Sequence, residues 1–389
     1  MKIAVIGAGN RARKYLSCLP EGVEVSCLVE PEEIRLSQTA ARYGVPPERC
    51  YSRPEAFFAA DHPEIEAVIV AAPDALHVPL ARACVGRGWH VLLEKPAALT
   101  EAEYQSLLNA SDKAGVAVAL CLEMRFHPYF LRIRELLSTL GPIREIDHIE
   151  HIGPDRMAHT FVRGLWSRTA DTGPIFLSKC CHDADIILWM TGAKLDGPVH
   201  GEGALTRFRP ESAPADASER CIDCPLRSRC YYSAVNLYQE RGEWIDGFDI
   251  PDGSTLQEVI AEELRNGRYG RCVYHCDNDV FDTQTVQARL TGGIQLRMRL
   301  DGTSLEEGRS IRIVAERGLL IVDKGYIILY RNDGDPVQED YTAMLHAPLH
   351  AGADKALVWD FFAAIREGRI PVTSLASAYE GHRLCYQAQ

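Results

Sequence analysis

The segment IAVIGAGNRA (residues 3–12) decides the fold of the first part of this chain. An apolar run ends at Gly7, and a polar, helix-like segment begins three residues later. The spacing Gly7-x-Gly9-x-x-Ala12 suits a strand-to-helix turn, because Gly7 permits the tight turn, Gly9 admits a close pyrophosphate, and Ala12 allows close helix–strand packing. We therefore predict a dinucleotide site whose first cofactor-binding residues are Gly7, Gly9, Asn10 and Arg11.

The second strand-like run ends in Glu30, 21 residues after Gly9. A carboxylate at this distance accepts hydrogen bonds from the ribose hydroxyls and disfavours a 2′-phosphate. We therefore predict Glu30 as a cofactor-binding residue and NAD as the cofactor in preference to NADP. Arg11 and Arg35 are nearby cations that would weaken this preference. The alternative is a glycine turn in another kind of α/β protein.

Strand-like and helix-like segments alternate over residues 1–125. The strand-like runs are 2–7, 23–30, 67–73, 90–96 and 116–120, and the helix-like segments are 10–19, 31–41, 75–88 and 100–115. Near-continuous apolar strands separated by amphipathic helices indicate a parallel sheet that is covered on both faces. The first predicted domain, residues 1–125, is therefore of the α/β class.

The pattern changes after residue 125. Helices are predicted at 128–140 and 174–191, an antiparallel strand at 143–152, and successive strands between 270 and 330. This indicates an α+β domain over 126–350, with a large open antiparallel sheet and helices on one face. The last predicted segment, 351–389, consists of helices that pack back on the body.

The open face of this sheet raises the question of a partner. We expect Ile294, Leu296, Met298 and Leu300 among the strands of the uncovered face. Because an apolar face in water needs cover, the prediction is a homodimer or homotetramer formed through the sheet.

The composition sets limits on other partners. The 389 residues carry a formal net charge of −12 and no long basic tract, which disfavours nucleic acid and anionic membrane surfaces. No apolar run approaches the roughly 18 residues that cross a bilayer. The N-terminus lacks the charged and apolar regions of a signal peptide, so we expect a cytoplasmic protein.

A lysine interrupts the apolar run LLEKPAALT (residues 92–100), where a buried charge would be costly. Open parallel sheets bind ligands at the carboxyl ends of their strands, and Lys95 stands at such an end. We therefore expect Lys95 to face the nicotinamide pocket. The cofactor-binding residues predicted at these strand ends are Ala72, Pro73, His77, Glu94 and Lys95.

With these motifs the sequence resembles the Gfo/Idh/MocA oxidoreductases. The matching pieces are IAVIGAGNRA, AAPDALH (71–77), LLEKP, RFHP (125–128) and CHDADIILWMTG (181–192), and they extend over essentially the whole chain. The resemblance implies a Rossmann domain and a substrate domain with an open-faced sheet. It also implies NAD(P)-dependent oxidation or reduction of hydroxyls in sugars, inositols and related polyols. Carried over to this chain, it makes Lys95 and His182 the catalytic residues.

These roles are chemically reasonable. Hydride leaves a carbinol carbon only as the hydroxyl proton leaves, so a base must lie within hydrogen-bonding reach, and a nearby cation stabilises the developing alkoxide. In one respect the sequence departs from the family, because Ser178 stands where its sugar dehydrogenases usually carry an aspartate, and Lys179 follows. The alternative for His182 is a helix histidine capped by Asp185, and for Lys179 a solvated lysine.

Further residues are predicted to bind substrate. Asp282 enters a strand from a dense polar run, and an aromatic such as Trp166 suits one face of a sugar but suits a protein core equally well. The alternative for Asp282 is a polar turn. The complete set of predicted substrate-binding residues is Lys179, Asp185, Arg125, Trp166 and Asp282.

Most of the 13 cysteines lie singly on apolar segments, where we expect small buried hydrophobic residues. Five examples are Cys18, Cys27, Cys84, Cys121 and Cys385. A cysteine-rich insertion at about 209–245 differs, because it contains a Cys-x-x-Cys motif. Two thiolates at this spacing reach one ion, so we predict a structural zinc site. Its ligands are Cys221, Cys224, Cys230 and Cys272, with Cys276 as the next choice for the fourth. The alternatives are free cysteines, a disulfide or an iron–sulfur cluster.

The predicted function is a dehydrogenase of a sugar, sugar acid or polyol. One alternative is a glycosidase that retains NAD and works by transient oxidation, elimination and re-reduction; the absent aspartate and Lys179 favour it. A second alternative is a sugar- or NAD-sensing protein without catalysis, which the presence of Lys95 and His182 disfavours. The sequence does not identify the sugar, because loop geometry sets substrate identity.

Overall fold

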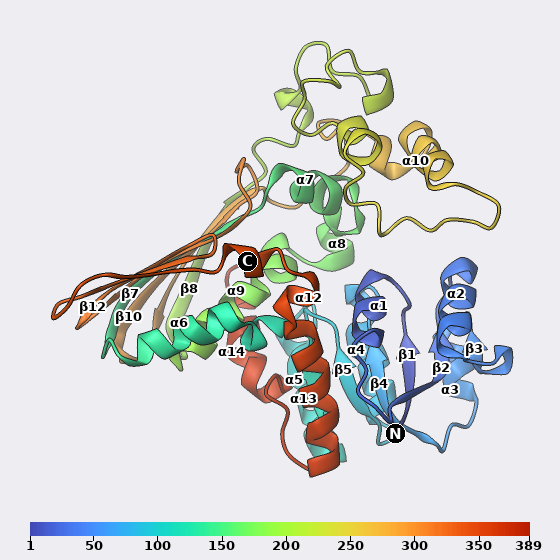
Figure 1. The fold of residues 1–389 in the computed structure, drawn as a ribbon, viewed down its shortest axis with the longest axis horizontal. Coiled ribbons are helices and arrows are strands. Elements are labelled where there is room, and N and C mark those ends of the chain that lie inside the picture. Colours follow the sequence, from blue (N-terminus) through green and yellow to red (C-terminus); the bar gives the residue numbers. More distant parts are fainter. The chain divides into compact units, whose positions relative to one another are not determined.

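The computed structural model describes residues 1–389 and divides into two compact units (Figure 1). The first unit comprises Met1–Leu131 with Leu345–Arg383, and the second comprises Arg132–Met344 with Leu384–Gln389. No helix of the chain has both the length and the apolar composition that a membrane crossing requires.

The first unit contains a six-stranded, fully parallel sheet in the order β3-β2-β1-β4-β5-β6. Its strands are β1 (Lys2–Ile6), β2 (Glu24–Val29), β3 (Cys50–Tyr51), β4 (Ile65–Val70), β5 (His90–Leu93) and β6 (Val118–Leu120). Its helices are α1 (Asn10–Leu16), α2 (Glu33–Tyr43), α3 (Pro54–Ala59), α4 (His77–Val85), α5 (Glu101–Ala114), α12 (Pro348–Ala351) and α13 (Ala353–Glu367). The strand order reverses between β1 and β4, as it does in the Rossmann fold. The predicted α/β class of this part is confirmed.

Local chemistry accounts for the helix ends. Thr100 and Glu103 form a reciprocal capping box at the start of α5, and Gly115 ends the helix in the left-handed conformation with φ of 66°. One face of the sheet packs against α13, where Phe361 and Phe362 are fully buried in a cluster with strand residues such as Val5. Each buried phenylalanine contributes about 1.5–3 kcal/mol, so this helix stabilises the sheet.

The second unit contains an eight-stranded sheet in the order β14-β13-β12-β11-β7-β10-β9-β8. The strands are β7 (Ile143–His151), β8 (Leu195–Ala204), β9 (Thr283–Leu290), β10 (Ile294–Asp301), β11 (Gly308–Ala315), β12 (Gly318–Asp323), β13 (Tyr326–Arg331) and β14 (Val337–Asp340). All neighbours are antiparallel except β7 and β10, which run parallel. The predicted open sheet is therefore confirmed, but it is mixed rather than purely antiparallel.

The helices of this unit include α7 (Pro154–Arg156), α8 (Thr169–Thr172), α9 (Ile175–Thr191) and α10 (Leu256–Arg265). A π-helical segment spans Met157–Arg163. The boundaries between the two units fall within α6 (Pro128–Ser138), α11 (Thr342–Leu345) and α14 (Leu375–Gln387).

The two faces of the eight-stranded sheet differ from our expectation. Ile294, Leu296, Met298 and Leu300, which we expected on an uncovered face, are 0–7% exposed and lie in the core. The alternate residues of the same strand, such as Arg297, are exposed, and Arg297 pairs with Asp147 of β7 at 2.6 Å. The alternation was right but its phase was reversed, because nothing in the pattern of one strand says which face a helix will cover.

Residues 205–282 join the neighbouring antiparallel strands β8 and β9, where a short hairpin would suffice. They contain α10 (Figure 1). Their buried side chains form a small core of their own. Its buried members include Ala234, Leu237, Tyr238 and Leu264. The cysteine-rich insertion is therefore longer than the predicted 209–245.

Candidate functional site

The glycine loop between β1 and α1 has the geometry of a dinucleotide turn. Gly7 has φ of +90°, and a Cβ added to it would lie 2.3 Å from the carbonyl oxygen of Ala71, so only glycine fits. At Gly9, in contrast, a Cβ would meet nothing within 4 Å. The main chain here faces open space, which is what the close approach of a pyrophosphate requires. Ala12 is fully buried in the core behind the loop.

The predicted ribose ligand Glu30 lies beside this loop. Its side chain is only 4% exposed, its Oε2 accepts a hydrogen bond from Ala8 N at 2.7 Å, and its Oε1 accepts one from Glu32 N at 3.1 Å. Both bonds hold the carboxylate at the end of β2, next to the glycine turn. As hydrogen-bond acceptors, the Glu30 oxygens therefore fit the hydroxyls of a nucleotide ribose at this position.

The loop after β5 is fixed through Glu94. Its Oε1 accepts hydrogen bonds from Arg11 Nε at 2.8 Å and from the Tyr15 hydroxyl, and its Oε2 accepts one from Lys95 N at 2.9 Å. Burial acts to raise the pKa of Glu94, but Arg11, Lys95 and Tyr15 outweigh it, and the pKa lies below the ordinary value. Glu94 is therefore a carboxylate that holds its own loop against α1.

Two histidines hold the main chain on the other side of Lys95. The side chain of His77 lies with Nδ1 2.7 Å from Pro96 O and Nε2 2.9 Å from Ala72 O. His382 Nε2 accepts a hydrogen bond from Ala97 N at 3.2 Å. Burial lowers the pKa of His382 to about 4, which keeps the ring neutral and able to accept. Lys95 itself is half-buried, and its peptide bond to Pro96 is cis.

The predicted cofactor residue Arg11 points its guanidinium into a group of acids. Besides Glu94 it pairs with Asp354 at 3.1 Å and lies 3.8 Å from Glu123. His350 Nδ1 lies 2.7 Å from Asp354 Oδ2. The Arg11 guanidinium is therefore already paired with carboxylates. This removes our reason for expecting Arg11 to weaken the preference for NAD over NADP.

In the second unit, helix α9 carries His182, Ser178 and Asp185 on one face, since positions i, i+4 and i+7 align on a helix. His182 is half-buried, whereas Ser178 and Asp185 are each 3% exposed. The Ser178 hydroxyl donates to Ile175 O at 3.4 Å. The position that departs from the family is therefore buried within the helix's own first turn.

The adjacent face of α9 bears Lys179 and Asp183, one turn apart, and both meet charged residues of the sheet. Lys179 Nζ lies 2.5 Å from Glu150 Oε1, and Asp183 Oδ1 lies 2.6 Å from Arg309 Nε. Glu150 pairs directly with Arg309 across strands β7 and β11. The expected substrate contact of Lys179 is therefore taken up by an ion pair between helix and sheet.

His148 completes this network. It lies two residues before Glu150, on the same face of β7, and its Nε2 is 3.1 Å from Asp183 Oδ1. Burial acts to raise the pKa of Asp183, but Arg309, His148 and Lys179 hold it well below its ordinary value. This network was not predicted from the sequence. A signal was present, because His148 and Glu150 alternate in step with apolar Ile146 and so lie on the same, buried face of β7.

The remaining predicted substrate residues have structural partners. Arg125 is 3% exposed and donates to Val372 O, Ser377 Oγ and Ser377 O at 2.9–3.0 Å. Asp282 is fully buried, and its oxygens accept bonds from the main chain of Thr206 and Arg207. Such a carboxylate anchors a turn, which is the alternative stated for Asp282. Trp166 is half-buried in a short 3₁₀ turn.

All 13 cysteines are free, and the five scattered ones are buried as expected. Cys221, Cys224 and Cys272 are 6–7% exposed, and Cys230 is half-buried. Arg220 and Arg271 form an antiparallel bridge, which brings the following residues Cys221 and Cys272 together from distant parts of the insertion.

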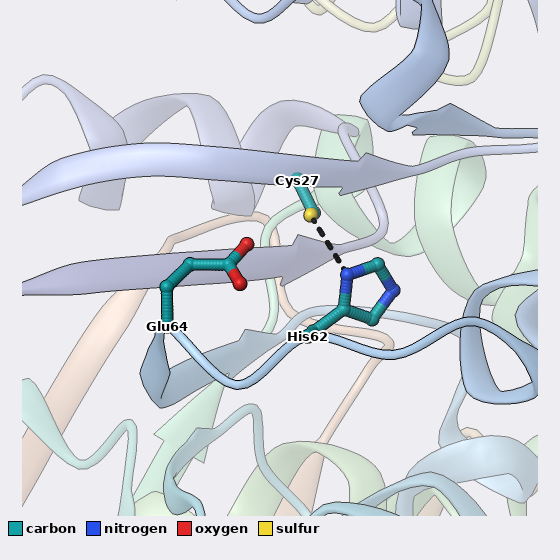
Figure 2. A group of neighbouring side chains, drawn as sticks. All are labelled: Cys27, His62 and Glu64. Atoms are coloured by element: carbon teal, nitrogen blue, oxygen red, sulfur yellow. Dashed lines mark hydrogen bonds between the residues drawn. The ribbon is translucent and has the colours of Figure 1, made fainter.

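Three groups of side chains could each hold a metal ion, because the ligand atoms within each group lie within 4.8 Å of one another. The groups are Cys27–His62–Glu64, Glu123–His350–Asp354 and His148–Glu150–Asp183. Figure 2 shows the first, with Cys27 on a strand and the other two on the loop before β4. Arg49 Nη1 lies 2.8 Å from Glu64 Oε1 and 2.9 Å from His62 Nδ1. A guanidinium thus takes the place of a metal ion here, as Arg11 and Arg309 do in the other two groups.

Comparison with known proteins agrees with this geometry. Residues 1–121 match the sequence model of the oxidoreductase family with NAD-binding Rossmann fold, Gfo/Idh/MocA. The putative oxidoreductase YteT of Bacillus subtilis strain 168 is 24% identical over 64% of this chain and 58% of its own length. Inositol 2-dehydrogenase 2 of Saccharopolyspora erythraea is 28% identical over 50% of this chain and 55% of its own. The chain thus spans little more than half the length of these curated relatives.

A solved structure shows the same fold throughout. An oxidoreductase from Agrobacterium radiobacter, solved with NAD⁺, L-tartaric acid and magnesium, superposes with a TM-score of 0.70 over 100% of this chain and 96% of its own, at 14% identity. Residues 1–121 are therefore similar to the NAD-binding Rossmann domain of the Gfo/Idh/MocA oxidoreductases.

Proposed function

We propose that the protein is an NAD-dependent oxidoreductase acting on a hydroxyl carbon of a sugar, sugar acid or polyol. The observation that carries this proposal is the glycine loop, where Gly9 faces open space beside the buried carboxylate of Glu30. The names of relatives, among them inositol 2-dehydrogenase, support the substrate class.

A bound nicotinamide would supply the hydride acceptor or donor. The chain's own residues hold and move protons: Lys95 Nζ or His182 accepts the hydroxyl proton as hydride leaves. The loop around Lys95 is held through Glu94, Pro96 O and Ala97 N, so the Lys95 amino group starts from a fixed main chain. Such pre-organisation lowers the cost of placing a charge at the reacting atoms.

The cofactor preference follows from Glu30. A 2′-phosphate would meet a carboxylate whose position is held by Ala8 N and Glu32 N, and two anions at this distance repel. We expect calorimetry to show NAD⁺ binding more tightly than NADP⁺, and Glu30→Ala to reduce that difference.

The activity is tested with a panel of sugars, sugar acids and polyols and added NAD⁺. Production of NADH in proportion to product supports a dehydrogenase, whereas cleavage of a glycoside without added cofactor identifies the NAD-retaining glycosidase. Lys95→Ala should lower turnover by about 10²–10⁴-fold. The matched control is Lys113→Ala, an exposed lysine on α5. Unchanged turnover in Lys95→Ala, or no binding of NAD(H) or NADP(H), would overturn the proposal.

Self-association, metal content and cellular location complete the proposal. The uncovered face of the sheet is charged, so a homodimer or homotetramer through it would pair ions such as Arg297 and Asp147 rather than bury apolar strands. Light scattering at a monomer mass would contradict it. We also propose that the protein is cytoplasmic. A structural metal centre held by the cysteines of the insertion is a further proposal.

A further inference from the structure

The insertion gathers five cysteines around one buried arginine. Arg163, from the π-helical segment, has no exposed surface and lies in a group with Cys221, Cys272 and Cys276, with which it interacts electrostatically. Cys230 interacts electrostatically with Cys221 and Cys224, and Cys272 also interacts with both. The five cysteines come from two stretches of chain, 221–230 and 272–276, and the Cys221 thiol contacts Arg271 O at 3.8 Å between them.

The contacts of Arg163 hold the two stretches together. Its Nε donates to Arg271 O at 2.6 Å, next to Cys272, and its Nη2 donates to Tyr232 O at 2.6 Å, two residues after Cys230. The same Nη2 lies 3.4 Å from Cys221 Sγ. One guanidinium therefore contacts both stretches that carry the cysteines.

A buried donor of Arg163 is left over. Its Nη1 has no accessible surface and no hydrogen-bond partner, although the guanidinium also interacts with the Tyr238 hydroxyl. A fully buried cation with an unused N–H is destabilising unless an acceptor or an anion is present. The site is therefore built for a negatively charged group among the thiols, with sulfur atoms that accept hydrogen bonds.

The spacing of the sulfurs bears on which group this is. Four thiolates around one zinc ion at about 2.3 Å lie within about 3.8 Å of one another. No three cysteines of the insertion have their sulfur atoms all within 4.8 Å of one another. In a [4Fe–4S] cluster each thiolate binds a different iron, so the four sulfurs stand farther apart than around a single ion.

We propose that Cys221, Cys224, Cys230 and Cys272 bind a [4Fe–4S] cluster, to which Arg163 donates a hydrogen bond. Cys276 is the fifth cysteine, and its thiol donates to Cys272 O at 3.2 Å, so it supports the loop rather than the cluster. Four thiolates around a [4Fe–4S]²⁺ core carry a net charge of −2, which the Arg163 guanidinium offsets in part. The cluster would cross-link an insertion whose own apolar core is small.

The test is the metal content of the full chain purified without oxygen, then reconstituted with ferrous iron and sulfide. We expect about four iron and four sulfide per chain, a broad visible absorbance, and an electron paramagnetic resonance signal after reduction with dithionite. Cys221→Ser and Cys272→Ser should each lose most of the iron. Cys276→Ser and the matched control Cys50→Ser, which lies on β3 of the other unit, should retain it.

The wild-type chain keeps the proposal falsifiable if a variant fails to fold. One zinc per chain with no iron would overturn it in favour of a single-ion site, and a chain that binds neither metal after reconstitution would overturn it altogether. Retention of iron by both Cys221→Ser and Cys272→Ser would place the cluster elsewhere. Calorimetry with NAD⁺ on the same preparations separates this outcome from failure of the proposed oxidoreductase function.

Discussion

Arg11 Nε lies 2.8 Å from Glu94 Oε1, which ties the helix after the glycine loop to the loop that carries Lys95. The pair lies among two further carboxylates, Glu123 and Asp354. The glycine loop and the loop that carries Lys95 are thus linked by one ion pair, and a change in either partner should alter both the stability and the pH dependence of the first unit.

We expect Arg11→Met to destabilise the protein by about 1–3 kcal/mol. The value lies below the about 3–5 kcal/mol of a fully buried broken pair, because the Arg11 side chain is 32% exposed. Chemical denaturation measures this difference. Lys14→Met, a half-exposed residue on the same helix, is the control and should change stability by less than about 0.5 kcal/mol. Equal effects of the two substitutions would refute the role of the pair.

Arg11→Met should also change how the free energy of unfolding decreases at acid pH. The folded-state pKa of Glu94 lies below its ordinary value of 4.5, so its contribution is present above that pH and is lost as the pH falls below it. Without Arg11, burial raises this pKa, and the loss should begin at higher pH. Thermal unfolding across pH checks the shift. Adding Glu94→Gln to Arg11→Met should abolish it.

His382 should make stability depend on pH in a different window. Its pKa falls from an ordinary value of 6.5 to about 4 in the folded state, so the unfolded chain binds the proton first. Stability should therefore decrease as the pH falls from 6.5 towards 4. His382→Gln should flatten this slope, whereas His346→Gln, at an exposed position, should leave it unchanged. An unaltered slope in His382→Gln would contradict the assignment.

The two glycines of the loop should respond differently to alanine. Gly7→Ala forces a positive φ and a contact with Ala71 O, and should destabilise the fold by more than about 1 kcal/mol. Gly9→Ala has room for its methyl group and should change stability by less than about 0.5 kcal/mol. If a pyrophosphate approaches Gly9, however, that variant should bind NAD⁺ at least about tenfold more weakly, which calorimetry measures. Full affinity in Gly9→Ala would argue against a pyrophosphate there.

Lys179 should be a positioning residue rather than a substrate contact. A double-mutant cycle of Lys179→Met and Glu150→Gln should give a coupling energy of about 1–3 kcal/mol, since the two groups form a buried ion pair 2.5 Å apart. The Lys179→Met variant should show lower stability with little change in KM. A large rise in KM without loss of stability would restore the predicted substrate role.

The order and type of the elements could be predicted where one local pattern implied one structure. The glycine turn, the alternation up to residue 125 and α9 are such cases, because apolar periodicity reports local geometry. Strand β8 (Leu195–Ala204), which contains three glycines, was missed. The phase of β10 was assigned to the wrong face, since burial is decided by helices distant in the sequence.

The sequence by itself determined the nucleotide fold, through Gly7 at a turn that no other residue fits and through Glu30 at the end of the next strand. It also singled out Lys95 and His182 as candidates for the chemistry. Only the tertiary structure decided their partners: it placed Arg11 against Glu94, Lys179 against Glu150, and Arg163 among the cysteines of the insertion. The physical reason is that turn geometry depends on a few neighbouring residues, whereas the partner of a buried charge depends on which distant segments share its low-dielectric surroundings.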